Sequence, residues 1–187
     1  MTSNKKIWSK TLLSSYNYLG RLCDSIDKII EKTAVNSYYC FSFQNSENSI
    51  ENISKKIINF SNRKIDYINL KVIIEKALKS IPKISAKLLI LKFIQKLSIE
   101  RACELLNITL RSSYRRLNNA LDEFCASLTT FGFTIEKLEV NYSTDPFISS
   151  IFKLIKNNNY LIEEKAEVIT KDCVFNRYLN ELMANVI

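Results

Sequence analysis

The chain has 187 residues, 47% of them hydrophobic and 11% aromatic, so its composition supports a buried core and excludes wholesale disorder. The chain has only two glycines and two prolines. This scarcity argues against a β-sandwich or barrel, whose many hairpins need these residues. The lack of histidine excludes His-dependent catalysis and the common zinc sites. A net charge of +8 favours a polyanionic partner, although a basic surface can also serve solubility alone.

The first third of the chain shows helical periodicity. Apolar residues recur at helical spacing from Trp8 to Asn36, which predicts one long amphipathic helix that packs in the core or forms a coiled-coil dimer seam. A polar loop over residues 42–49 and a shorter helix over 50–60 are expected next, followed by a joint at 62–64. From Asp66 the periodicity resumes and ends at the Ile81-Pro82 step, where a helix is expected to stop.

The rest of the chain is also predicted to be mostly helical. The periodicity predicts helices over residues 85–95, 98–106 and 109–128, with Gly132 near the C-terminal cap of the last. Residues 134–142 show some alternation and are predicted to form a short strand. Beyond Pro146, helices are expected over 147–156, 161–170 and 172–184, with the first break at the Asn-rich residues 157–159.

The positive charge is concentrated in one short stretch. Residues 81–120 carry two acids, Glu100 and Glu104, against eight basic residues, a net of +6: Lys83, Lys87, Lys92, Lys96, Arg101, Arg111, Arg115 and Arg116. This stretch is therefore the part of the chain most suited to an anionic partner.

Within that stretch, residues 97–121 fit two crossed helices joined by a three-residue turn. Ser98 can cap the first helix, Ala102 is small where the helices cross, Asn107 tolerates the left-handed backbone of a turn, and Thr109 can cap the second helix. The second helix has an expected buried stripe of Leu110, Leu117, Leu121 and Phe124. Its outward face then holds Arg111, Ser112, Arg115, Asn118 and Asn119.

The fold class predicted from these patterns is all-α. It comprises a long N-terminal helical segment over residues 1–64, a helix-turn-helix DNA-binding domain over 65–130 and a helical C-terminal extension over 131–187.

The segment resembles the helix-turn-helix of region 4 of the sigma-70 family of transcription factors, including related phage and mobile-element regulators. The resemblance covers about Asp66 to Phe124. At the position of Asn107 the family usually has Gly, and at the position of Ser113 it usually has Val or Ile. The residues that match its pattern are Leu97, Ser98, Ala102, Leu105, Ile108, Thr109, Arg116, Leu117, Ala120 and Leu121.

The resemblance implies that the second helix lies in the major groove of double-stranded DNA. It places four residues at base edges: Arg111, Ser112, Tyr114 and Arg115. It makes five others candidates for phosphate contacts: Lys96, Arg101, Thr109, Arg116 and Asn119.

We therefore expect a sequence-specific, DNA-binding transcriptional regulator. Two alternatives stay open: a sigma factor that binds core RNA polymerase, and a helical adaptor or viral packaging subunit whose degenerate helix-turn-helix docks protein. Residues 1–65 do not match the promoter-melting region of a sigma factor. A homodimer through the N- or C-terminal helices is possible.

We expect no enzyme, because the chain has no phosphate-cradling Gly-rich loop and no nucleophile elbow. No cofactor, metal or membrane partner is expected either. Five cysteines without a regular spacing or an export signal indicate a cytoplasmic protein with reduced thiols.

Overall fold

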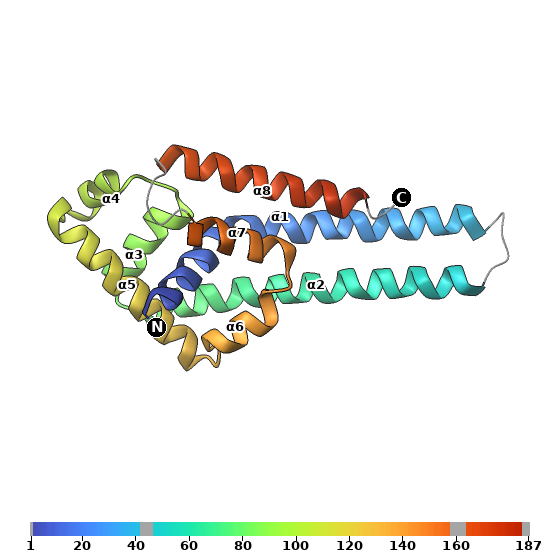
Figure 1. Ribbon diagram of the computed structural model, residues 1–187, viewed down its shortest axis with the longest axis horizontal. Coiled ribbons are helices and arrows are strands. Elements are labelled where there is room, and N and C mark those ends of the chain that lie inside the picture. The colour runs from blue at the N-terminus through green and yellow to red at the C-terminus, as the bar shows by residue number, and fades with distance from the viewer. Residues whose placement is uncertain (1, 42–46, 158–163, 185–187) are drawn as a thin grey trace.

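The computed structural model describes residues 2–41, 47–157 and 164–184, and every element in these ranges is a helix, which confirms the all-α class (Figure 1). In chain order the elements are α1 (Thr2–Phe41), α2 (Glu47–Ser80), α3 (Lys83–Leu89), the π-helical turn η1 (Ile90–Ile94), α4 (Ile99–Leu106), α5 (Leu110–Thr130), α6 (Ile135–Tyr142), α7 (Pro146–Asn157) and α8 (Glu164–Ala184).

The long helices α1 and α2 lie side by side as an antiparallel hairpin, and α8 runs along α1 (Figure 1). The predicted apolar stripe of α1 is confirmed, because Leu12, Leu19, Leu22 and Ile26 are all fully buried. This stripe packs within the chain, so it is not available as a seam between two copies. The helix continues through Gly20, where an added Cβ would meet only the flexible end of Lys71.

The predicted joint at residues 62–64 is wrong, because α2 runs through it without a break. The segment holds neither Gly nor Pro, and its side chains make tertiary contacts that favour helix. Arg63 donates from Nη1 to the Tyr178 hydroxyl of α8 at 3.2 Å, and Lys64 pairs with Asp27 of α1. The predicted loop over 42–49 is wrong for residues 47–49, which form the first turn of α2, and residues 42–46 lie outside the described residues.

The strand predicted over residues 134–142 is also wrong, because this segment forms α6. Thr134 caps the helix by accepting a hydrogen bond from the Lys137 backbone N–H at 3.4 Å. Leu138 and Tyr142 lie one helical turn apart and are both buried, which is a helical rather than an alternating pattern.

An aromatic cluster ties α7 and α8 to α1. The ring of Phe147, at the start of α7, lies 5.7 Å from Tyr18, 6.0 Å from Phe175 and 5.8 Å from Tyr178, measured between centroids. The predicted break at residue 171 is wrong, because α8 is continuous from Glu164 to Ala184. The expected Asn-rich break falls partly outside the described residues.

A hydrogen-bonded network crosses this cluster. The buried Tyr67 hydroxyl of α2 donates to Asp145 Oδ2 at 2.7 Å and lies 3.0 Å from the Tyr178 hydroxyl. Burial, together with the negative charge of Asp145, raises the pKa of Tyr67 far above its ordinary value. The hydroxyl therefore keeps its proton and remains a donor. Asp145 also accepts from the Ile148 backbone N–H, so one carboxylate both caps α7 and binds α2.

One hydrophobic core joins the three sequence ranges predicted as domains. It includes Leu19 from the first range, Leu121 and Phe124 from the second, and Phe147 and Phe175 from the third. The predicted boundary between residues 64 and 65 falls inside α2.

Candidate nucleic-acid interface

Helices α4 and α5 form the two crossed helices predicted from the sequence, joined by residues 107–109. Ser98 accepts a hydrogen bond from the Arg101 backbone N–H at 3.2 Å, which confirms the predicted cap of α4. Asn107 adopts φ 51° and ψ 44°, the left-handed conformation predicted for the turn. The chain therefore reverses where the pattern placed the turn.

The two helices pack around a small satellite core. Ala102 is fully buried at the crossing, next to Leu88 of α3 and Ile99 and Cys103 of α4. Ser113 is also fully buried, and its hydroxyl donates to the Leu110 carbonyl at 2.6 Å. The hydroxyl of Ser113 is thus satisfied within its own helix, which removes most of the cost of burying it.

The left-handed turn gives a test of local stability. Replacing Asn107 by Val is expected to lower the free energy of unfolding by about 1–2 kcal/mol, because a β-branched residue is strained at positive φ. Replacing Asn107 by Gly, which accepts this conformation freely, is expected to leave stability equal or higher. Urea unfolding followed by circular dichroism measures both, and equal stabilities for the Val and Gly variants would contradict the assignment.

Two details of the predicted motif are wrong. Leu110 was expected in the buried stripe but is 46% exposed, because α5 begins beyond the helices that cover its later turns. Thr109 occupies the N-cap position of α5, but its side chain makes no cap hydrogen bond. Its hydroxyl instead donates to Ser112 Oγ at 3.1 Å, and Ser112 donates to the Thr109 carbonyl.

The second half of α5 belongs to the core, whereas the first half projects from it (Figure 1). Leu121, Phe124 and Leu128 are buried. Helix α1 also holds this half through a Lys6–Asp122 ion pair of 3.3 Å and a hydrogen bond from the Ser9 hydroxyl to the Leu121 carbonyl. The N-terminal turns of α5 therefore extend from a second half that is held in the core.

The structure brings most of the predicted contact residues together on these projecting turns. Arg111, Tyr114, Arg115, Arg116 and Asn119 are exposed, and Ser112 is half-buried beside Thr109. Among the described residues, none forms an ion pair with Arg111, Arg115 or Arg116. No acidic residue lies between Leu110 and Leu121, so the positive charge of these turns is not offset locally.

Two predicted phosphate contacts lie elsewhere. Arg101 is exposed on α4 and pairs with Glu104 at 2.6 Å. Lys96, in a left-handed backbone conformation, donates from Nζ to the Tyr18 hydroxyl at 3.1 Å and lies 3.7 Å from Asp172 Oδ1. Lys96 therefore holds the segment before α4 against α1 and α8.

An apolar group that the sequence pattern did not predict lies on the same projecting end. Leu105 at the end of α4 and Leu110 and Tyr114 on α5 are each about half exposed. Tyr114 was predicted as a base contact and Leu110 as part of the buried stripe, so neither was expected in an exposed apolar group.

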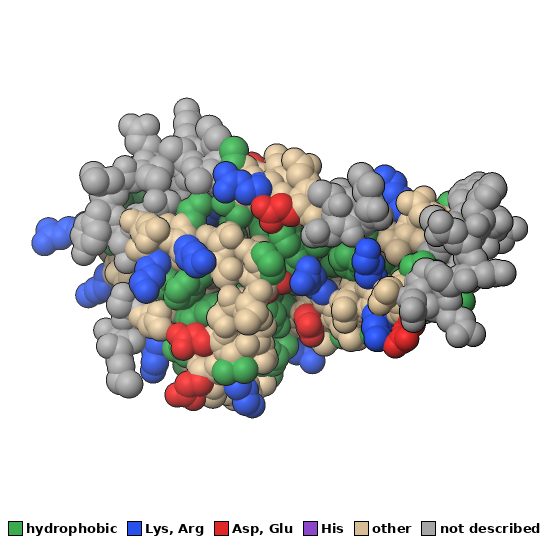
Figure 2. All heavy atoms as spheres, turned by 45° about the vertical axis from the view of Figure 1, so that its right-hand side comes forward, with side chains coloured by type: hydrophobic (Ala, Val, Ile, Leu, Met, Phe, Trp, Pro, Cys, Tyr) green, Lys and Arg blue, Asp and Glu red, His purple; other side chains and the backbone are tan. Residues whose placement is uncertain are grey.

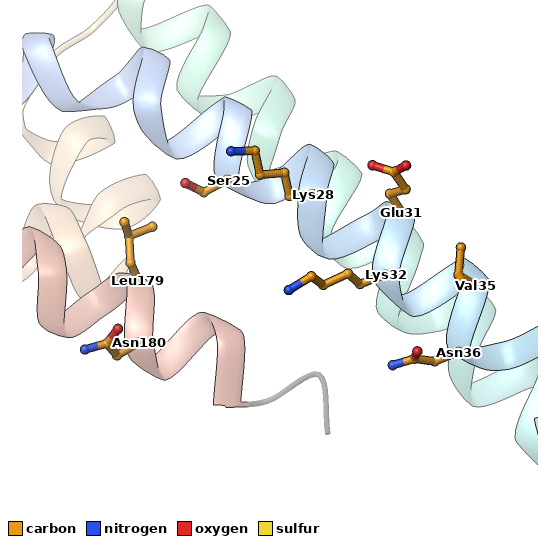
Figure 3. Close-up of a pocket in the computed structure, with 8 residues that line it drawn as sticks. All are labelled: Ser25, Lys28, Glu31, Lys32, Val35, Asn36, Leu179 and Asn180. Carbon is orange, nitrogen blue, oxygen red and sulfur yellow. The ribbon is translucent and has the colours of Figure 1, made fainter.

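Mixed charge is found elsewhere on the described surface. Figure 2 shows a face on which Lys and Arg side chains are spread among Asp and Glu. A hollow of about 530 Å³ lies between α1 and α8 (Figure 3), lined by Ser25, Lys28, Glu31, Lys32, Val35, Asn36, Leu179 and Asn180. Its two lysines share the lining with Glu31, so the local charge is mixed.

No family model, curated protein or solved structure matches the chain. Within residues 2–41, 47–157 and 164–184, no helix combines the length and apolarity needed to cross a bilayer. Over the same residues, the Cys, Asp and Glu side chains do not gather into a possible metal site.

Proposed function

We propose that this chain is a transcriptional regulator that binds double-stranded DNA in a sequence-specific manner through α4 and α5. The observation that carries the proposal is the projecting start of α5, which is exposed, basic and free of acids between Leu110 and Leu121. A helix of this kind fits the major groove, which admits one α-helix. The resemblance to sigma region 4 adds support from the same residues.

In this proposal the base contacts come from one side of α5. Arg111 and Arg115 lie one turn apart, so both guanidinium groups can reach successive guanines through O6 and N7. Ser112 offers a hydroxyl, and Tyr114 offers a hydroxyl and an apolar ring that suits a thymine methyl group. These contacts would select sequence.

Phosphate contacts would fix the position of the helix on the duplex. Arg116 and Asn119 are exposed beside the base-contact residues, and Thr109 lies at the N-terminus of α5, where the helix dipole favours an anion. Arg101 would break its ion pair with Glu104 and bind a phosphate instead. Lys96 would need to leave Tyr18 and Asp172, so we expect its contribution to be the smallest of the five.

The proposal is tested by selecting bound duplexes from a random pool and titrating salt against the selected sequence. We expect an enriched motif and a linear fall of log affinity with log salt, with a slope of about 0.9 for each phosphate contacted. Equal affinity for selected and random duplexes would contradict sequence-specific binding. The proposal puts the protein in the cytoplasm, where free thiols such as Cys173 stay reduced.

A second candidate function is a helical adaptor that docks protein through the same end of the molecule. The exposed apolar residues Leu105, Leu110 and Tyr114 favour it, because apolar side chains anchor protein interfaces. An adaptor would bind duplex DNA weakly and without sequence preference. A sigma factor would in addition recover core RNA polymerase subunits in a pull-down.

A further inference from the structure

A groove of about 480 Å³ lies where α1, the C-terminal end of α2, α3 and η1 meet, here called the α3 groove. Ala86, Ile90 and Ile94 line it at four-residue spacing along α3 and η1, Leu78 lines it from α2, and the ring of Tyr16 lines it from α1. Leu78 is buried, but the other four are only half-buried, so apolar surface of the groove is open to water. Its volume is in the range of pockets that hold ligands.

The charge around the α3 groove is positive on two of its walls. Lys79 lines the groove from α2, and Lys83 and Lys87, one helical turn apart, line it from α3. All three side chains are exposed, and none of them forms an ion pair with a described residue. The apolar lining is therefore flanked by cations that the described part of the chain does not neutralise.

Glu75 is the one acid among the described residues that line the groove, and it is already engaged. The Tyr16 hydroxyl donates to Glu75 Oε1 at 2.8 Å. Burial and this hydrogen bond raise the pKa of Tyr16 to about 12, so the hydroxyl keeps its proton and stays a donor. The sequence has no other acid between Tyr67 and Ile99, and α1 has none before Asp24. The elements that form the groove thus favour an anionic occupant.

The combination of an apolar lining and cations on two walls is selective among anions. An amphipathic helix with acidic residues on both sides of its apolar face satisfies the lining and both walls at once. A fatty acid carries a single carboxylate, so it would leave the cations of one wall unpaired. A nucleic acid would pair with the lysines through its phosphates but would leave the apolar lining without a partner.

We propose that the α3 groove binds an acidic amphipathic helix of a partner protein. Apolar side chains at helical spacing on the partner pack against Leu78, Ala86 and Ile90, and its carboxylates pair with the lysines of α2 and α3. Arg111 and Arg115 do not line this groove, so the bound helix is expected to leave them open to a duplex.

The proposal is tested without DNA, using a fluorescein-labelled synthetic peptide of about 18 residues, or about five helical turns. The peptide has Leu at helical spacing on one face and Glu on both sides of that face. A second peptide has the same composition in an order that gives no apolar face. Fluorescence anisotropy is followed as the full chain is titrated from about 0.1 to 100 µM. The amphipathic peptide is expected to bind at least about tenfold more tightly than the second one.

Two kinds of variant locate the binding site. Lys83→Glu with Lys87→Glu is expected to weaken binding of the amphipathic peptide at least about tenfold, because like charges then face each other. The matched control, Lys28→Glu with Lys32→Glu, makes the same charge change at the same spacing on exposed lysines of α1 outside the groove. Ala86→Gln changes the apolar lining but no charge, and is expected to weaken binding at least about fivefold.

Every variant should keep the wild-type helical circular dichroism, and the α1 control should bind like the wild type. Equal binding of the two peptides, or of neither, overturns the proposal. So does an α1 control that loses as much affinity as the α3 variant, or an Ala86→Gln variant that binds like the wild type. Laurate and a random-sequence duplex serve as competitors. If either displaces the labelled peptide at a lower concentration than the unlabelled peptide does, the groove belongs to a lipid or to nucleic acid instead. Since the binding measurements contain no α5 variant, the groove can fail while sequence-specific duplex binding survives, and the reverse.

Discussion

Replacing Arg111 and Arg115 together by Ala is expected to weaken binding to the selected duplex by about 2–6 kcal/mol, taking about 1–3 for each bidentate contact to guanine. Both side chains are exposed on the projecting turns of α5, so the change should leave the fold intact. Fluorescence anisotropy with the selected and a scrambled duplex measures the loss. Binding to the scrambled duplex should fall much less, since base contacts specify sequence.

The matched control for that variant removes the same charge elsewhere. Lys28 and Lys32 are exposed on α1 and line the hollow against α8 (Figure 3). Replacing both by Ala should shift affinity only slightly, equally for the two duplexes, because it changes only the long-range field. If the arginine and lysine variants lose affinity equally, α5 is not the recognition helix.

Replacing Phe147 by Ala is expected to lower the free energy of unfolding by about 3–5 kcal/mol, the range for removing a large aromatic side chain from a core. Phe147 is fully buried and contacts aromatic rings from α1 and α8, so the change leaves a cavity where three helices meet. Urea unfolding of the variant and the wild type measures the loss in the free energy of unfolding.

The control for this change is Phe131→Ala, which removes the same side chain from a position that is 42% exposed at the end of α5. We expect a smaller loss there, about 1–2 kcal/mol, because the side chain stays partly exposed and less apolar surface leaves water on folding. A Phe147→Ala variant as stable as the Phe131→Ala variant would mean that α7 and α8 do not contribute to the core.

The helix-turn-helix could be predicted from the sequence because its signals are local. A cap at Ser98, a small residue at Ala102 and a left-handed Asn107 each act within a few residues, and all three are in place. The continuity of α2 could not be read the same way. The polar residues 62–64 have the composition of a joint between two helices. They stay helical because Arg63 and Lys64 contact α8 and α1, whose residues are far away in the sequence.

The exposure of Leu110 shows what periodicity cannot supply. Leu110 and Leu121 lie about three turns apart on nearly the same side of α5, so a helical pattern treats them alike. Only Leu121 is covered, because α1 reaches that part of the helix. Which turns of a helix leave the core depends on the lengths and positions of its neighbours. The residues of the candidate site were thus predictable, but their shared projection was not.

The division of α5 between core and surface limits how the protein can be shortened. A fragment spanning only residues 65–130 would lack α1, so Leu121 would be exposed to water and the ion pair between Lys6 and Asp122 would be lost. Any truncation meant to retain the projecting arginines must therefore keep the opening turns of α1 as their scaffold.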